Sequence, residues 1–93
     1  MECVFETKDY VFHVNKIGTG LIDMCLSQLG ISVDINTVLY LNKKFLRKMQ
    51  AYVQCKGMDY LAKNPYTYFH IADCLSSMLL LMSSDEKVQV RFC

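Results

Sequence analysis

The side chains that could do chemistry in this 93-residue chain are its five cysteines and two histidines. No two cysteines form a CxxC pair, and His13 and His70 stand far apart in the sequence. A structural zinc site usually takes its ligands in close pairs, because two ligands from one turn reduce the entropic cost of assembling the site. We therefore predict no metal site and no bound cofactor. The cysteines are Cys3, Cys25, Cys55, Cys74 and Cys93.

His70 and Cys74 have the spacing of a possible base and nucleophile. They stand four residues apart, so they share one face of a helix and could touch. Acyl transfer also needs donors that stabilise an oxyanion, and this segment has no glycine that could shape such a site. We expect a buried cysteine beside a helix histidine, and we predict that the chain is not an enzyme.

Charge argues against a general affinity for nucleic acid or an acidic membrane. Ten Lys and Arg residues against nine Asp and Glu residues give a net charge of +1. A single basic cluster is present, and it is typical of the solvated face of an amphipathic helix. The alternative is a small nucleic-acid-binding protein that contacts phosphates through this cluster. Its members are Lys43, Lys44, Arg47 and Lys48.

The apolar content favours a folded domain with surface left over for a protein partner. Apolar residues make up 53% of the chain, which excludes compositional disorder. A domain of this size buries only about 60 to 65% of the surface of its unfolded chain. We predict one domain over residues 1–93, with part of the apolar surface available for binding.

The cysteines and the start of the chain predict a reducing, intracellular environment. The number of cysteines is odd, and the first six residues carry acidic charge where a secretory signal would be basic and apolar. The most apolar stretch, residues 74–84, is far shorter than the ~20 residues that cross a membrane. We expect a cytoplasmic or nuclear protein without a membrane segment.

Four segments are predicted to be strands. Residues 3–5 and 10–14 are aromatic and β-branched and flank a polar stretch, which predicts a β-hairpin. Residues 38–41 end a segment with a period of two, and residues 88–92 alternate strictly between apolar and polar side chains. The last strand is expected to pair with the sheet or to lend its edge to a partner.

Three helices are predicted, over residues 21–29, 43–56 and about 65–82. Gly18 and Gly20 interrupt the apolar pattern before the first helix, and Gly30 is placed to take the left-handed position after it. Asn42 is expected to cap the second helix and Gly57 to end it. Proline at position 65 suits the first residue of the third helix.

The third helix and the final strand supply the candidate partner-binding residues. The third helix is apolar on most sides, so its side chains cannot all face one core. Aromatic and methionine side chains are common anchors of binding interfaces. A final strand that pairs with a neighbouring copy would instead give a structural homo-oligomer, such as a homodimer. The candidates are Tyr66, Phe69, Met78, Leu79, Met82, Val88, Val90 and Phe92.

The order of these elements resembles the BTB/POZ fold of the elongin C and Skp family of cullin adaptors. The hairpin at residues 5–14 is similar to the opening of that family, with a polar turn leading into a strand that has an aromatic residue two positions before a valine. Residues 38–42, followed by Leu46, Met49 and Tyr52, are similar to the third strand of the family and the helix after it. This chain closes with a strand in place of the final short helix of elongin C.

The resemblance implies a small α+β domain of BTB/POZ type, with an N-terminal β-hairpin and a third strand packed with helices. It also implies a non-catalytic protein–protein interaction adaptor. Such an adaptor bridges a cullin, the scaffold of a ubiquitin ligase complex, to a substrate-receptor subunit. No individual cullin contact can be placed on this sequence, because no contact motif matches it.

Overall fold

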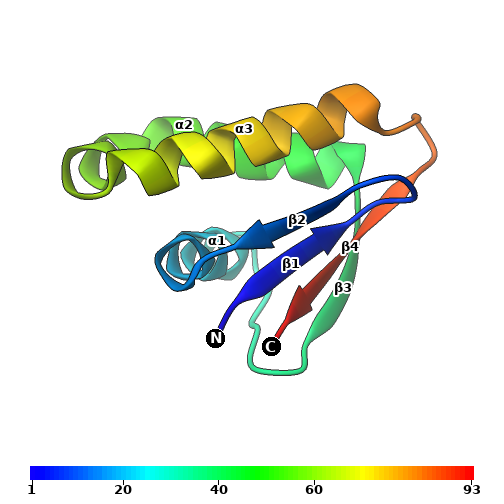
Figure 1. Ribbon diagram of the computed structural model, residues 1–93, viewed down its shortest axis with the longest axis horizontal. Helices are drawn as coiled ribbons and strands as arrows, with labels where there is room; N and C mark the ends of the chain where they lie inside the picture. Colours follow the sequence, from blue (N-terminus) through cyan, green and yellow to red (C-terminus); the bar gives the residue numbers. More distant parts are fainter.

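The chain folds in the order β1–β2–α1–β3–α2–α3–β4. This is a computed structural model, which describes the backbone of residues 1–93 and all side chains except those of Met58 and Leu61. One antiparallel sheet has the strand order β2–β1–β4–β3. Figure 1 shows α2 and α3 side by side above the sheet, with α1 beneath them and seen nearly end-on. The prediction of a small α+β domain is confirmed.

The β-hairpin is formed by β1 (Cys3–Glu6) and β2 (Val11–Val14). Their register pairs Cys3 with Val14 and Glu6 with Val11. The turn is closed by Thr7, whose backbone N–H donates to the Tyr10 carbonyl at 2.8 Å. The Thr7 hydroxyl accepts a hydrogen bond from the Tyr10 N–H at 3.0 Å. The predicted hairpin is therefore confirmed, with the polar stretch as its turn.

Helix α1 (Lys16–Gln28) ends where the sequence predicts but begins five residues earlier. The Gly30 and Ile31 N–H groups donate to the carbonyls of Ser27 and Leu26, at 3.1 and 2.8 Å, and Gly30 has φ +90°. This is a Schellman cap, whose left-handed residue is usually glycine. The expected start at residue 21 is wrong, because the helix accommodates both of its glycines.

The early start of α1 depends on an N-cap and on close packing. The Asn15 side chain accepts a hydrogen bond from the Gly18 N–H at 2.8 Å. A Cβ at Gly18 would lie 2.7 Å from Val14 Cγ1. The glycine therefore allows the helix to approach the end of β2, and it does not interrupt the helix.

Strand β3 (Val38–Asn42) leads directly into α2 (Lys43–Lys63). The predicted cap is confirmed, since the Asn42 side chain accepts a hydrogen bond from the Phe45 N–H at 2.9 Å. The predicted end at Gly57 is wrong. A Cβ at this position would lie 1.9 Å from Cε2 of Tyr68, on the neighbouring helix. Gly57 thus provides room for the Tyr68 ring.

Helix α3 (Pro65–Leu81) starts at proline as predicted and leads to β4 (Lys87–Phe92). Strand β4 lies between β1 and β3, with Phe5 opposite Val90 and Val90 opposite Leu39. It is therefore an inner strand of the sheet, and both its edges are paired. Lys43 joins the ends of two helices, because its ammonium group donates to the Met82 carbonyl at 3.1 Å.

The core lies between the helices and one face of the sheet. Burial alternates along β4, and the inward side chains of the sheet include Phe5, Val90 and Phe92, each at most 1% exposed. Leu46 and Ile71 are fully buried and contribute the helical side of the same cluster. The opposite face of the sheet carries an ion pair between Arg91 and Glu6, 3.6 Å apart. The helical layer thus covers one face and leaves the other open.

Candidate interaction surfaces

The candidate residues on α3 divide between the surface and the core. Tyr66 is 92% exposed and Phe69 is 56% exposed. The Phe69 ring meets Tyr68 edge to face, with centroids 5.4 Å apart, which holds it against a half-buried neighbour. Met78 and Met82 are buried in the core, and Leu79 is half-buried. The structure therefore leaves Tyr66 and Phe69 available for a partner and places both methionines in the core.

The candidate residues on β4 lie in the centre of the sheet. Val88, Val90 and Phe92 are each at most 1% exposed. Because β1 and β3 occupy both edges of the strand, β4 offers no free edge to a partner. Pairing of this strand with a neighbouring copy would require it to leave its own sheet. The three residues belong to the core of this structure.

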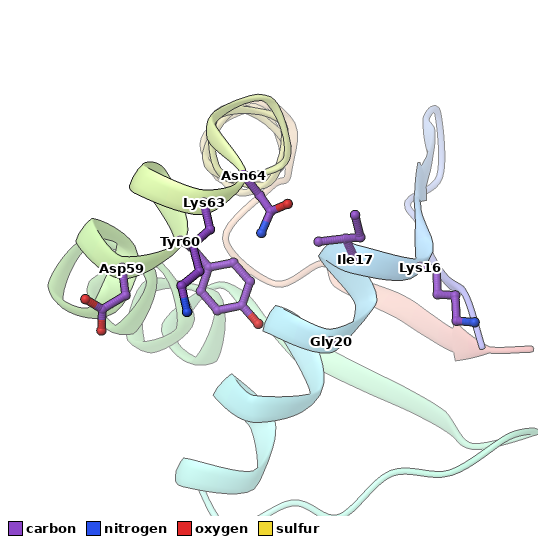
Figure 2. Close-up of a pocket in the computed structure, with 7 residues that line it drawn as sticks. All are labelled: Lys16, Ile17, Gly20, Asp59, Tyr60, Lys63 and Asn64. Atoms are coloured by element: carbon purple, nitrogen blue, oxygen red, sulfur yellow. The ribbon is translucent and has the colours of Figure 1, made fainter.

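An apolar groove between α1 and α2 was not predicted from the sequence. Its larger hollow has a volume of about 480 Å³. Figure 2 shows Ile17 and Asn64 facing one another across it, and the Tyr60 ring beside Gly20, while Lys16 and Asp59 point away. Ile17 is 50% exposed there. The lining residues are Lys16, Ile17, Gly20, Asp59, Tyr60, Lys63 and Asn64.

A second hollow continues the groove along the same two helices. It has a volume of about 260 Å³ and is lined by Met24 and Tyr52, among others. The Tyr60 hydroxyl donates to Met24 Sδ at 3.4 Å. This contact joins Tyr60, which lines the larger hollow, to Met24, which lines the smaller one. We call both hollows together the α1–α2 groove.

The sequence does contain a signal for this groove. Ile17, Gly20 and Met24 recur at intervals of three and four residues, which is one face of a helix. Because the sequence predicts a helix that starts only at residue 21, it does not place Ile17 and Gly20 on that face.

The sequence also does not predict the exposure of Leu80 and Leu81, on the last turn of α3. A run of five apolar residues does not reveal which members face solvent.

A third hollow lies between the end of β2 and the start of α3. It has a volume of about 350 Å³ and is lined by His13, Asn15, Tyr66, Thr67 and His70. His70 Nε2 lies 3.1 Å from the backbone carbonyl oxygen of His13. A carbonyl can only accept, so Nε2 carries the proton in this contact. The exposed Tyr66 therefore stands beside a polar hollow.

The thiols in the core are not suited to nucleophilic attack. Burial raises the pKa of Cys25 and of Cys74 from 9.0 to about 12. The pKa of Cys3 is raised to about 12 by burial and, after it, by the neighbouring thiols Cys74 and Cys93. A thiol attacks as the thiolate, which such values suppress at neutral pH. Cys74 is buried, whereas His70 is exposed and bonded to the His13 carbonyl.

The described residues contain no group of three or more His, Cys, Asp and Glu side chains that could hold a metal ion. Within the same part of the chain, no helix is both long enough and apolar enough to cross a membrane. Every buried side-chain nitrogen or oxygen atom that the structure describes has a hydrogen-bond partner. The candidate binding features of the described residues are therefore exposed apolar side chains and one basic helix face.

The basic cluster lies on the outer side of α2. Lys44, Arg47 and Lys48 are exposed, while Lys43 is half-buried and bonded to the end of α3. Helix α2, which begins at its Asn42 cap directly after β3, thus places three of the four predicted cations together at the surface.

No family model, curated protein or solved structure matches this chain. The fold defines a small α+β domain with exposed apolar and basic surfaces.

Proposed function

We propose that this chain is a non-catalytic protein–protein interaction module whose partner docks in the α1–α2 groove. The observation that carries the proposal is the groove itself, where Ile17 remains half-exposed beside a hollow of about 480 Å³. Grooves between helices are common sites for an apolar side chain or an amphipathic helix of a partner. Ile17 and the exposed parts of Met24 and Tyr60 form the floor and walls.

The exposed aromatic residues of α3 extend the proposed surface. Asn64 lines the groove and Tyr66 lines the neighbouring hollow, so the start of α3 lies between them. Tyr66 is almost fully exposed, so its ring buries little apolar surface in the isolated domain. Aromatic side chains of this kind are enriched among the residues that dominate binding energy.

Photo-cross-linking from the groove tests this proposal. A photoreactive amino acid at position 17 should form an adduct with a defined protein in extract from the cells in which the chain occurs. The same amino acid at position 35 is the matched control, because Ile35 is 60% exposed but lies outside the groove. Equal adducts from both positions, or none from position 17, would show that the groove is not a docking site.

The more specific form of the proposal is an adaptor of the BTB/POZ, elongin C and Skp type. What supports it is the resemblance of the hairpin, of β3 and of the start of α2 to that family. In this form, one partner is a cullin and another is a substrate receptor. The inner position of β4 is a feature of this chain for which the resemblance does not account. Binding to the amino-terminal half of a cullin is the direct test.

A further inference from the structure

The outer face of α2 carries an unrelieved positive charge. Five of the ten Lys and Arg residues of the chain lie between residues 43 and 56, and residues 43–58 include no Asp or Glu. At 100° per residue, Lys44, Arg47 and Lys48 share one side of the helix, and all three are exposed. We call these three residues the basic face.

This charge is unfavourable for the helix that bears it. Lys44 and Lys48 are like charges at i and i+4, which repel each other on a helix surface. Lys44 also lies in the first turn, next to the positive end of the helix dipole, where acidic residues are favoured. Local electrostatics would therefore select different residues at these positions.

No described group of the chain neutralises the basic face. Among the side chains that the structure describes, the one ion pair joins Arg91 to Glu6 on the open face of the sheet. All three basic side chains are exposed, so none of them belongs to the core. Among the described residues, no ion pair uses these charges, so they remain open to an external anion.

We propose that the basic face binds an acidic helix of a partner protein, at a surface separate from the α1–α2 groove. The next turns on the same side carry Ala51 and Cys55, which are small, exposed and uncharged. Small residues let a second helix lie close along this side, while carboxylates near its end meet the cations. The proposal does not depend on what occupies the groove.

A second copy of the chain fits this role poorly. Its nine acidic residues are scattered, and the one adjacent pair is Asp85 and Glu86. Glu86 already accepts hydrogen bonds from the Lys8 and Ser83 backbone N–H groups, at 3.3 and 3.2 Å. A nucleic acid is also disfavoured, because the net charge is only +1 and, among the described side chains, no exposed aromatic ring stands between the cations to stack on bases.

The test uses the full chain and a fluorescent helical peptide of about 20 residues, roughly 30 Å long, with Glu along one side. The peptide should bind, and a peptide with Gln in place of Glu should bind at least about tenfold more weakly. Arg47→Glu together with Lys48→Glu should abolish binding of the Glu peptide and create binding of a Lys peptide. Lys8→Glu with Lys87→Glu makes the same change in net charge and should leave the Glu peptide bound.

Two exposed cysteines locate the peptide on the surface. Cys55 lies beside the basic face, whereas Cys93 lies at the C-terminus, and Figure 1 shows α2 and that terminus on opposite sides of the molecule. The bound Glu peptide should slow alkylation of Cys55 and leave that of Cys93 unchanged. Equal affinity for the Gln peptide, unchanged binding by the Arg47→Glu and Lys48→Glu variant, or equal protection of both thiols would overturn the proposal. Tighter binding of a duplex DNA than of the Glu peptide would also overturn it.

Discussion

At the scale of single residues, Gly57 explains how two helices come into contact. The ring of Tyr68 on α3 occupies the space that a side chain at position 57 of α2 would fill. Glycine inside a helix costs about 1 kcal/mol relative to alanine. Contact between the two helices compensates for that cost, because it brings Tyr68 against the core cluster. Gly20 in α1 has no such neighbour, since nothing lies within 4 Å of a Cβ placed there.

The two glycines should therefore respond in opposite ways to replacement by alanine. Gly57→Ala should lower the free energy of unfolding by about 1 to 3 kcal/mol, the range for overpacking. Gly20→Ala should raise it by about 0.5 to 1 kcal/mol, because a flexible helix residue is replaced in open space. Urea denaturation measures both. In a Tyr68→Ala background the loss from Gly57→Ala should disappear, and a loss that persisted would place its cause elsewhere.

The buried thiols predict how stability depends on pH. Cys3, Cys25 and Cys74 hold their protons up to a pKa of about 12 in the folded chain, against an ordinary value of 9.0. Their contribution is therefore complete below pH 9 and is lost as the pH rises towards 12. The free energy of unfolding should fall by up to about 1.4 kcal/mol per pH unit for each thiol in this window.

Urea denaturation between pH 8 and about 11 tests this dependence on the buried thiols. Cys25→Ala should make the decrease of stability with pH less steep, because one of the three buried thiols is removed. Cys55→Ala, at an exposed position, is the matched control. An identical pH dependence in Cys25→Ala and the unmodified protein would show that this thiol is not the cause.

At the scale of elements, the helix ends that were predicted correctly are those that depend on a short stretch of sequence. The Asn42 cap, the proline start of α3 and the glycine end of α1 each depend on a few neighbouring residues, and each is present in the structure. Gly18 and Gly57 were misread because glycine serves both at helix ends and at close contacts. Whether a glycine ends a helix or makes room for a neighbour depends on a side chain that is distant in sequence. A local sequence pattern does not reveal that side chain.

The start of α2 combines a good cap with unfavourable charge. Lys44→Glu should raise the free energy of unfolding by about 0.3 to 1 kcal/mol, because it places an acid in the first helical turn and removes a like-charge pair. Lys56→Glu is the control and should not raise stability, because position 56 lies outside the first turn of α2 and three residues before Asp59. Thermal or urea denaturation at low salt measures the difference. A loss of stability in Lys44→Glu would show that Lys44 makes a contact that the fold needs.

At the scale of the whole molecule, the last strand completes the sheet. β4 joins the hairpin to β3, and its inward side chains are core residues. The sequence predicted the strand but not its inner position, since pairing between chain ends depends on long-range contacts. For the same reason, Tyr66 and Phe69 could be proposed as surface residues, whereas the burial of Met78 depends on how α3 is oriented on the sheet.

Removal of residues 87–93 should therefore unfold the domain. The deletion removes the strand that pairs with both β1 and β3. It therefore exposes Phe5 and the inner face of β3, and it leaves the β1–β2 hairpin as an isolated pair of strands. Circular dichroism and the dispersion of amide resonances report the loss of structure. A shortened chain that stayed folded and changed only its oligomer size would instead identify β4 as an element exchanged between copies.

The absolute mass of the protein in solution tests the central claim most directly. Light scattering should be performed on the chain alone and after co-expression with the amino-terminal half of a cullin. We expect a stable complex whose mass is the sum of the two chains, and we expect Ile17→Asp to weaken it while Ile35→Asp does not. A homodimer that ignores the cullin, or a monomer in both samples, would contradict the adaptor function.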